Sequence, residues 1–292
     1  MKKYNYTPDI DDKNYLKKII SEKKYIKNCT ERNEDICISC SDFIEKKCYK
    51  KILEINYEKL TSLYENYSRD VNFQEITAVE KESYVSLYEK QTKSTKELLG
   101  KIKENFESEP CPYCGIGGVP NTIEHILPKE IYPQYSIFSK NLIPCCAECN
   151  SRKGSKVKNL ENNEYYTYNF YEDKIPNQEY LKVHIEIISN VPKAIFEISE
   201  GANILFKNHI KTLNLLERYS QNSNIIFSEN QIRFKRYPIK NIDLFREECN
   251  KEYEVCKEKY GTNYYKGLLY QEMGKSREYL NYLFNNLNIQ LK

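Results

Sequence analysis

Two cysteine pairs constrain the fold of this chain more than any other feature of its sequence. Cys111-Pro-Tyr-Cys114 and Cys146-Ala-Glu-Cys149 each have the C-x2-C spacing, and 31 residues separate them. Each such turn places two thiolates on one side of an ion, so two turns supply the four tetrahedral ligands of structural zinc. The alternative is four unrelated buried cysteines, but two pairs flanking a glycine- and proline-rich segment are hard to obtain by chance. We therefore predict a closed structural zinc site.

The overall composition excludes some classes of protein and leaves others open. The chain has 292 residues and no apolar run that approaches the ~20 residues of a membrane span. Its basic N-terminus has no apolar stretch behind it, so we expect no secretory signal and a cytoplasmic location. In that reducing compartment clustered cysteines favour a metal over disulfides. The net charge of +3 is too small to indicate nucleic-acid binding by itself.

The first part of the chain is predicted to be mainly helical. Apolar residues recur there at helical spacing, and helices are expected over Lys46–Tyr67 and Thr77–Phe106. A group of prolines and glycines begins at Pro110 and ends the helical pattern, which places a boundary near that residue.

The last part of the chain changes pattern again. Tyr180–Ile188 and Ala194–Ile198 alternate in polarity, which predicts a hairpin. Further helices are expected near 203–228, 241–259 and 276–288. The predicted class is α+β, predominantly helical, with regions 1–109, 110–160 and 161–292 and a small metal-rich unit in the middle.

Four polar residues between and beside the cysteine pairs have no role in a zinc scaffold. Thr122–Ile126 has strand-like content, and the NLIP stretch forms a second extended piece. Asn150 follows the second cysteine pair directly, where the stretch SRKGSKVKN could begin a helix. The expected order is strand, loop, strand and helix, clamped by zinc. The four residues that this unit leaves to be explained are Glu124, His125, Asn141 and Asn150.

The string C-x2-C…EH-I-x-P…NLIP-x-C-x2-C-N-x2-KG, from Cys111 to Lys156, resembles the HNH endonucleases and their ββα-metal fold. The resemblance implies that His125 is the general base and that Asn141 pins the loop that aims it. It implies that Glu124 and Asn150 hold a catalytic divalent ion. It also implies that the four paired cysteines hold zinc. The chain departs from the common family pattern by Glu in place of Asp before the base and by Asn in place of His at position 150.

The chemistry of phosphodiester hydrolysis fits these residue types independently. A neutral histidine can accept the proton of an attacking water near pH 7. A cation bound by one carboxylate and one amide oxygen keeps positions open for phosphate and water. Oxygen ligands favour Mg²⁺ or Mn²⁺ over zinc, so two metals with different tasks are expected.

Basic residues near the motif are candidate nucleic-acid contacts, and the alternative is a solvated charged face. Lys153 occupies the lysine position of the N-x2-K-G tail and is expected to contact phosphate. For the cluster at 233–240 the solvated face is favoured. The predicted nucleic-acid-binding set is Lys129, Arg152, Lys153 and Lys156.

The other cysteines and histidines are interpreted mainly as structural. Cys145 is out of register and is expected to be a buried free thiol. Cys249 and Cys256 are expected to share one packed helix face, and His184 and His209 to be structural. A second zinc site is a weaker alternative to a helical stripe for Cys29, Cys37, Cys40 and Cys48.

The resulting hypothesis is a metal-dependent HNH endonuclease that cleaves DNA. The alternatives are an RNA-cleaving enzyme directed at tRNA, and a non-catalytic zinc module that binds nucleic acid or a partner protein. The segments EHILPKEIYPQYSIFSKNLIPCCAECN and NHIKTLNLLERY are similar to stand-alone HNH effectors of bacterial anti-phage systems, including Septu-type and retron-associated nucleases. This resemblance implies a defence role and a partner subunit. No G-x4-GK-[ST] loop is present, so an ATPase would be another chain.

Overall fold

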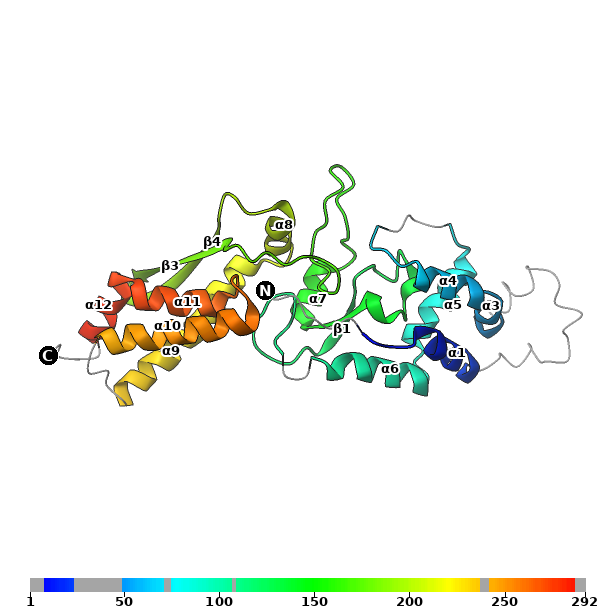
Figure 1. The fold of residues 1–292 in the computed structure, drawn as a ribbon, viewed down its shortest axis with the longest axis horizontal. Helices are drawn as coiled ribbons and strands as arrows, with labels where there is room; N and C mark the ends of the chain where they lie inside the picture. The colour runs from blue at the N-terminus through cyan, green and yellow to red at the C-terminus, as the bar shows by residue number, and fades with distance from the viewer. Residues whose placement is uncertain (1–7, 24–48, 71–74, 107–108, 237–241, 287–292) are drawn as a thin grey trace, which may run out of the picture.

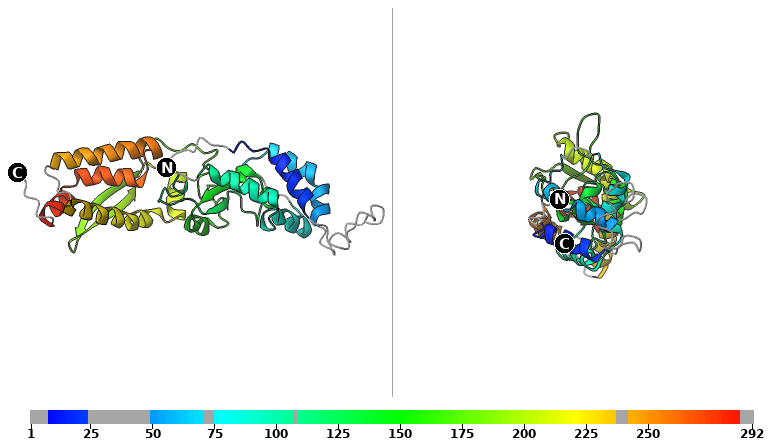
Figure 2. Two further views of the ribbon diagram at one scale, coloured as in Figure 1. Left: turned by 90° about the horizontal axis from the view of Figure 1, so that it is seen from below. Right: turned by 90° about the vertical axis from the view of Figure 1, so that its right-hand side faces the viewer.

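The computed structural model describes residues 8–23, 49–70, 75–106, 109–236 and 242–286. The molecule is elongated, with the N-terminal helices at one end and the C-terminal hairpin and helices at the other (Figures 1 and 2). The segment that carries the two cysteine pairs lies between these ends. Mixed helices and two small hairpins agree with the predicted α+β class. Within the described residues no helix is long and apolar enough to cross a bilayer.

The central unit has the predicted order of strand, loop, strand and helix. Strands β1 (Thr122–His125) and β2 (Leu142–Cys145) pair antiparallel, with Thr122 opposite Cys145 and His125 opposite Leu142. Helix α7 (Ala147–Lys153) follows directly, and the Sγ atom of Cys146 caps it by accepting a 3.4 Å hydrogen bond from the amide of Cys149. Gly154, at φ +50°, ends the helix in a conformation that favours glycine.

The β1–β2 hairpin contributes to two hydrophobic cores. Ile123 and Leu142 pack into a core with the N-terminal helices. Ile126, Ile143 and Cys145 pack into a second core with the C-terminal part of the chain. The first core therefore crosses the predicted boundary at 110, and the second crosses those at 110 and 160. The three-region division stays a prediction.

The N-terminal helices are shorter than predicted. The expected helix Lys46–Tyr67 is two helices from Tyr49 onward, which meet at Asn56, and its first residues lie outside the described ranges. The expected helix Thr77–Phe106 is also divided, because the Thr92 side chain caps a new helix by accepting from the amide of Thr95. The helices are α1 (Asp12–Glu22), α3 (Tyr49–Ile55), α4 (Tyr57–Glu65), α5 (Ala78–Glu89) and α6 (Lys93–Glu104).

The C-terminal part contains the predicted hairpin and more helices than predicted. Ser189 and Asn190, both at positive φ, form the tight turn of the hairpin. The expected helix near 203–228 is broken by Asn214, at φ +51°, and the helix before the last one was not predicted. The elements are β3 (Leu181–Ile188), β4 (Val191–Ile198), α8 (Ile204–Thr212), α9 (Leu215–Arg236), α10 (Ile242–Tyr260), α11 (Tyr265–Lys275) and α12 (Arg277–Asn286).

Helices α10 and α11 approach each other closely through small residues. Cys249 and Cys256 are both buried on α10, which confirms that they share one packed face. A Cβ atom on Gly267 would lie 2.8 Å from the Cβ of Cys256, and one on Gly274 would lie 3.1 Å from the Cβ of Cys249. The two glycines of α11 thus set the distance between these helices.

Candidate active site and metal centre

The four paired cysteines come together in one cluster, in which Cys146 is partly exposed and the other three are buried. The Sγ atoms of Cys111, Cys114, Cys146 and Cys149 all lie within 4.8 Å of one another. The Sγ atoms of Cys114 and Cys146 are 3.9 Å apart, far beyond the ~2.05 Å of a disulfide. A tetrahedral zinc with bonds of ~2.3 Å separates its sulfur ligands by about 3.8 Å. The number, type and spacing of the donors therefore fit a structural zinc ion.

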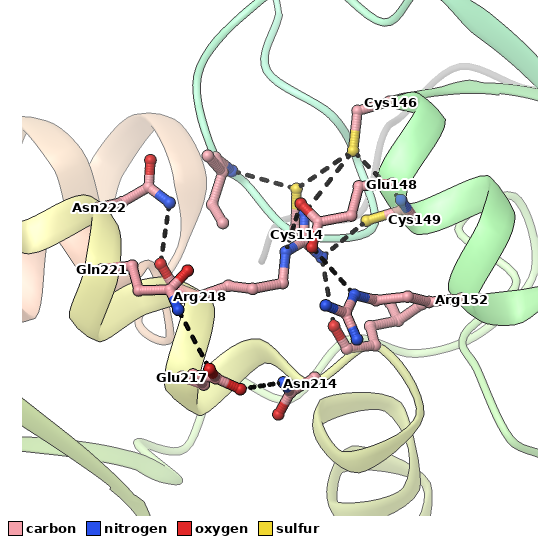
Figure 3. A network of polar contacts seen from close by, with 12 residues as sticks. Cys114, Cys146, Glu148, Cys149, Arg152, Asn214, Glu217, Arg218, Gln221 and Asn222 are labelled. Carbon is pink, nitrogen blue, oxygen red and sulfur yellow. Dashed lines mark hydrogen bonds and ion pairs between the residues drawn. The ribbon is translucent and has the colours of Figure 1, made fainter.

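A buried arginine from α9 faces this cluster (Figure 3). Arg218 donates from Nη1 to the Sγ of Cys149 at 3.3 Å and from Nη2 to the Sγ of Cys146 at 3.8 Å. Its Nε lies 3.0 Å from a carboxylate oxygen of Glu148. Burial has the largest single effect and lowers the pKa of Arg218, but Cys149, Cys114 and Glu148 together outweigh it and raise the pKa. This guanidinium offsets thiolate charge, and no local motif indicated it in the sequence.

A buried histidine from α8 holds the first cysteine pair. His209 lies with Nε2 2.7 Å from the carbonyl oxygen of Tyr113, and its Nδ1 accepts a 3.3 Å hydrogen bond from the amide of Tyr168. Burial lowers the pKa of His209 to about 3, so the ring is neutral at pH 7. Both nitrogens are occupied by backbone groups, which agrees with the structural interpretation. His184, by contrast, lies on the surface beside Glu186.

His125 ends β1 with its ring held in one orientation. Its Nε2 lies 2.9 Å from the carbonyl oxygen of Ser136. Because a carbonyl only accepts, Nε2 carries the proton, and Nδ1 keeps its lone pair. Among the described residues Nδ1 has no hydrogen-bond partner. The ring of Tyr88 packs edge-on against the imidazole, with centroids 4.6 Å apart. Burial lowers the pKa of His125 to about 4, which keeps it neutral at pH 7.

Asn141 closes the loop that carries Ser136. Its Oδ1 accepts from the amide of Leu127 at 2.7 Å, and its Nδ2 donates to the carbonyls of Leu127 at 3.0 Å and Tyr135 at 3.1 Å. The side chain is fully buried. These three bonds join the two ends of the loop between β1 and β2, and the role of Asn141 in aiming His125 stays a prediction.

Asn150 extends from α7 to the free edge of β1. Its Nδ2 lies 3.4 Å from the carbonyl oxygen of Ile123 and 3.2 Å from the Oγ1 of Thr122. The carbonyl can only accept, so the amide orientation is fixed. The Oδ1 atom of Asn150 makes no hydrogen bond within the described residues and is free to bind a cation.

Glu124 and Lys153 form a buried ion pair beside this edge. The Nζ of Lys153 lies 2.6 Å from Oε1 of Glu124 and 2.9 Å from the carbonyl oxygen of His125. The residues are 5% and 1% exposed, respectively. Burial raises the pKa of Glu124, partly offset by the ammonium, and burial lowers the pKa of Lys153. This placement differs from the predicted phosphate contact, because the ammonium is engaged by the carboxylate and is closed to the surface.

The other predicted basic contacts are mostly paired with acids. Arg152 bonds Glu148 at 2.9 Å, and Lys129 lies 2.6 Å from Glu130. Lys156 is exposed and donates to the carbonyl of Arg152 at 3.2 Å. Their role in binding nucleic acid stays a prediction.

Apart from the two cysteines of α10, the cysteines outside the cluster are one observed thiol and one group that the structure does not test. Cys145 is fully buried outside the four-sulfur cluster, with its Sγ 3.4 Å from Oγ1 of Thr122. It is a free thiol, as expected. The proposed second site lies outside the described residues, and its members are Cys29, Cys37, Cys40 and Cys48.

We expect purified protein to carry one tightly bound zinc ion for each chain. Cys149→Ser should lose the zinc and lower the melting temperature sharply, because binding of structural zinc contributes directly to folding. The matched control is Cys145→Ser, next to the cluster, which should keep the metal. Elemental analysis and thermal unfolding measure both effects. Full zinc content in Cys149→Ser would contradict the assignment.

Comparisons with known proteins agree with this geometry. Residues 111–156 match the HNH endonuclease family. The chain is also 30% identical over 118 residues to protein ea31 of Escherichia phage lambda, a match that covers 38% of this chain and 40% of the phage protein. No solved structure matches the chain. The cysteine cluster, the β1–β2 hairpin and α7 thus lie within an HNH endonuclease domain at residues 111–156.

Proposed function

We propose that this protein is a metal-dependent endonuclease that hydrolyses phosphodiester bonds of DNA. The observation that carries the proposal is the state of His125. Its Nε2–H is directed to the Ser136 carbonyl, and its Nδ1 lone pair is left for another proton. Glu124 precedes it in β1, and Asn150 lies at the edge of the same strand.

These side chains have separable tasks in the proposed reaction. His125 accepts a proton from the attacking water at Nδ1, while the Ser136 carbonyl holds the ring and stabilises the imidazolium that forms. Glu124 and Asn150 are the residues that would hold Mg²⁺ or Mn²⁺, which supplies charge stabilisation at the phosphate and leaving oxygen. Asn141 and Lys153 are positioning residues: the first fixes the loop, and the second fixes the Glu124 carboxylate.

The choice of DNA is part of the proposal, since phosphate chemistry is common to DNA and RNA. The match to HNH endonucleases supports a nuclease. Matched DNA and RNA substrates of equal length, incubated with Mg²⁺ or Mn²⁺, distinguish the two substrate classes.

The His125→Ala variant should lose about 10²- to 10⁴-fold in cleavage rate, the usual contribution of general-base catalysis. A plasmid-nicking assay that is sensitive to EDTA measures this loss. The matched control is His184→Ala, which removes a surface histidine and should cleave like the wild type. If His125→Ala cleaved as fast as the wild type, the general-base assignment would be wrong.

Binding of Mn²⁺ should stabilise the folded protein through Glu124. At a Mn²⁺ concentration 100 times its Kd, ligand linkage adds about 2.7 kcal/mol to the free energy of unfolding. The Glu124→Gln variant should lose this gain, and Glu130→Gln, which removes a nearby carboxylate paired with Lys129, should keep it. Thermal unfolding with and without Mn²⁺ measures the difference. If Mn²⁺ stabilised both variants equally, the assignment of Glu124 as a metal ligand would be wrong.

A role as effector of an anti-phage defence system, with an ATPase or other subunit as partner, extends the proposal. It is supported by the resemblance of the segments around β1 and α8 to such effectors. Phage should then form fewer plaques on cells that express the chain with its candidate partner than on cells that express the His125→Ala variant with the same partner. Equal plaque numbers across a panel of phages would count against this role.

A further inference from the structure

A groove of about 500 Å³ lies between the N-terminal helices and the HNH endonuclease domain. Tyr88 of α5 and Lys96 and Lys103 of α6 line one side, and Thr122 of β1 and Asn150 of α7 line the other. No carboxylate is among the described residues that line it. The groove is therefore a cationic and polar surface that crosses from the flanking helices to the candidate site.

The groove is continuous with the proposed catalytic residues. Asn150 is shared between them, because it lines the groove and is a candidate ligand of the divalent ion. Tyr88 lines the groove and packs edge-on against the His125 ring. A strand lying in the groove would therefore lead directly to the scissile phosphate.

The spacing and charge of Lys96 and Lys103 suit contacts with phosphates along a nucleic-acid strand. They are seven positions apart, which is about 10.5 Å along a helix axis. This is about three of the 3.4 Å spacings between successive charges of one DNA strand, measured along the duplex axis. Gly100 lies between them on the same helix, and a Cβ atom there would meet nothing within 4 Å, so the backbone is open. Both lysines are exposed, and neither forms an ion pair with any described residue, whereas Arg152 and Lys129 are paired with acids.

We propose that this groove binds the sugar-phosphate backbone of the substrate DNA strand beside the scissile bond, with Lys96 and Lys103 as the phosphate contacts. The inference rests on the proposed function and deepens it, because it assigns substrate binding to the N-terminal helical region. The basic residues after the motif then contribute less, since Lys153 is buried and Arg152 is paired.

The test is a binding measurement that does not depend on cleavage. The His125→Ala protein is titrated with fluorescein-labelled DNA at several salt concentrations, in buffer without chelator or added divalent ions so that the cysteine cluster keeps its zinc. The slope of log K against log salt is determined by anisotropy. Adding Lys96→Gln and Lys103→Gln should reduce the magnitude of that slope by about 1.4 to 1.8, which is about 0.7 to 0.9 for each phosphate that the protein no longer neutralises. Lys96→Arg with Lys103→Arg should restore it.

The matched control is Lys93→Gln with Lys101→Gln, which makes the same charge change on the same helix outside the groove. This pair should leave the slope close to that of the parent. An equal change in both pairs, or no measurable DNA binding by the parent at low salt, would overturn the groove assignment. Cleavage by His125→Ala at the wild-type rate would instead refute the proposed catalytic function, and the binding result would still decide the groove.

Discussion

The close approach of four cysteine sulfur atoms is the constraint on which the rest of the structure depends. Thiolates within 4.8 Å repel one another unless a cation lies among them. The C-terminal region contacts the domain at the cysteine pairs themselves. His209 binds the Tyr113 backbone, Tyr219 donates to the Cys114 carbonyl at 2.9 Å, and Arg218 donates to Cys149. The cysteine cluster thus organises the domain and also the region that packs on it.

The N-terminal helices act on the other face of the hairpin, where they set the position of His125. Ser136, whose carbonyl orients the imidazole, donates from its hydroxyl to the Tyr84 carbonyl of α5 at 2.6 Å. Asp12 of α1 accepts from the amide of Ser139 at 2.9 Å and from its hydroxyl at 2.7 Å, and burial raises the pKa of Asp12 to about 6. The loop between β1 and β2 is therefore anchored to two flanking helices. The geometry of the candidate base depends on residues far outside the segment 111–156 that matches the family.

The sequence predicts the parts of the site that have a local signature. Fixed spacing identifies the cysteine pairs, and alternation identifies the β3–β4 hairpin. The divisions at Asn56 and Thr92 were missed because apolar spacing continues across them, while side-chain caps and tertiary packing end the helices. Arg218 and Tyr88 were missed because they reach the site only through the fold. The segment NHIKTLNLLERY is an example. Its sequence shows a resemblance to HNH effectors, but it does not show that His209 and Arg218 contact the cysteine pairs.

Lys153 shows how burial changes the meaning of a motif position. Removing an ammonium and a carboxylate from water costs several kcal/mol for each ion, so this pair is a poor source of stability. Its geometry has a different consequence, because the ammonium holds one carboxylate oxygen and the His125 carbonyl at once. Only Oε2 of Glu124 is then left to meet a cation, and the adjacent positive charge weakens that attraction. A pair of this kind favours an oriented carboxylate over a tight metal site, which suits a cation that must keep positions open for water and phosphate.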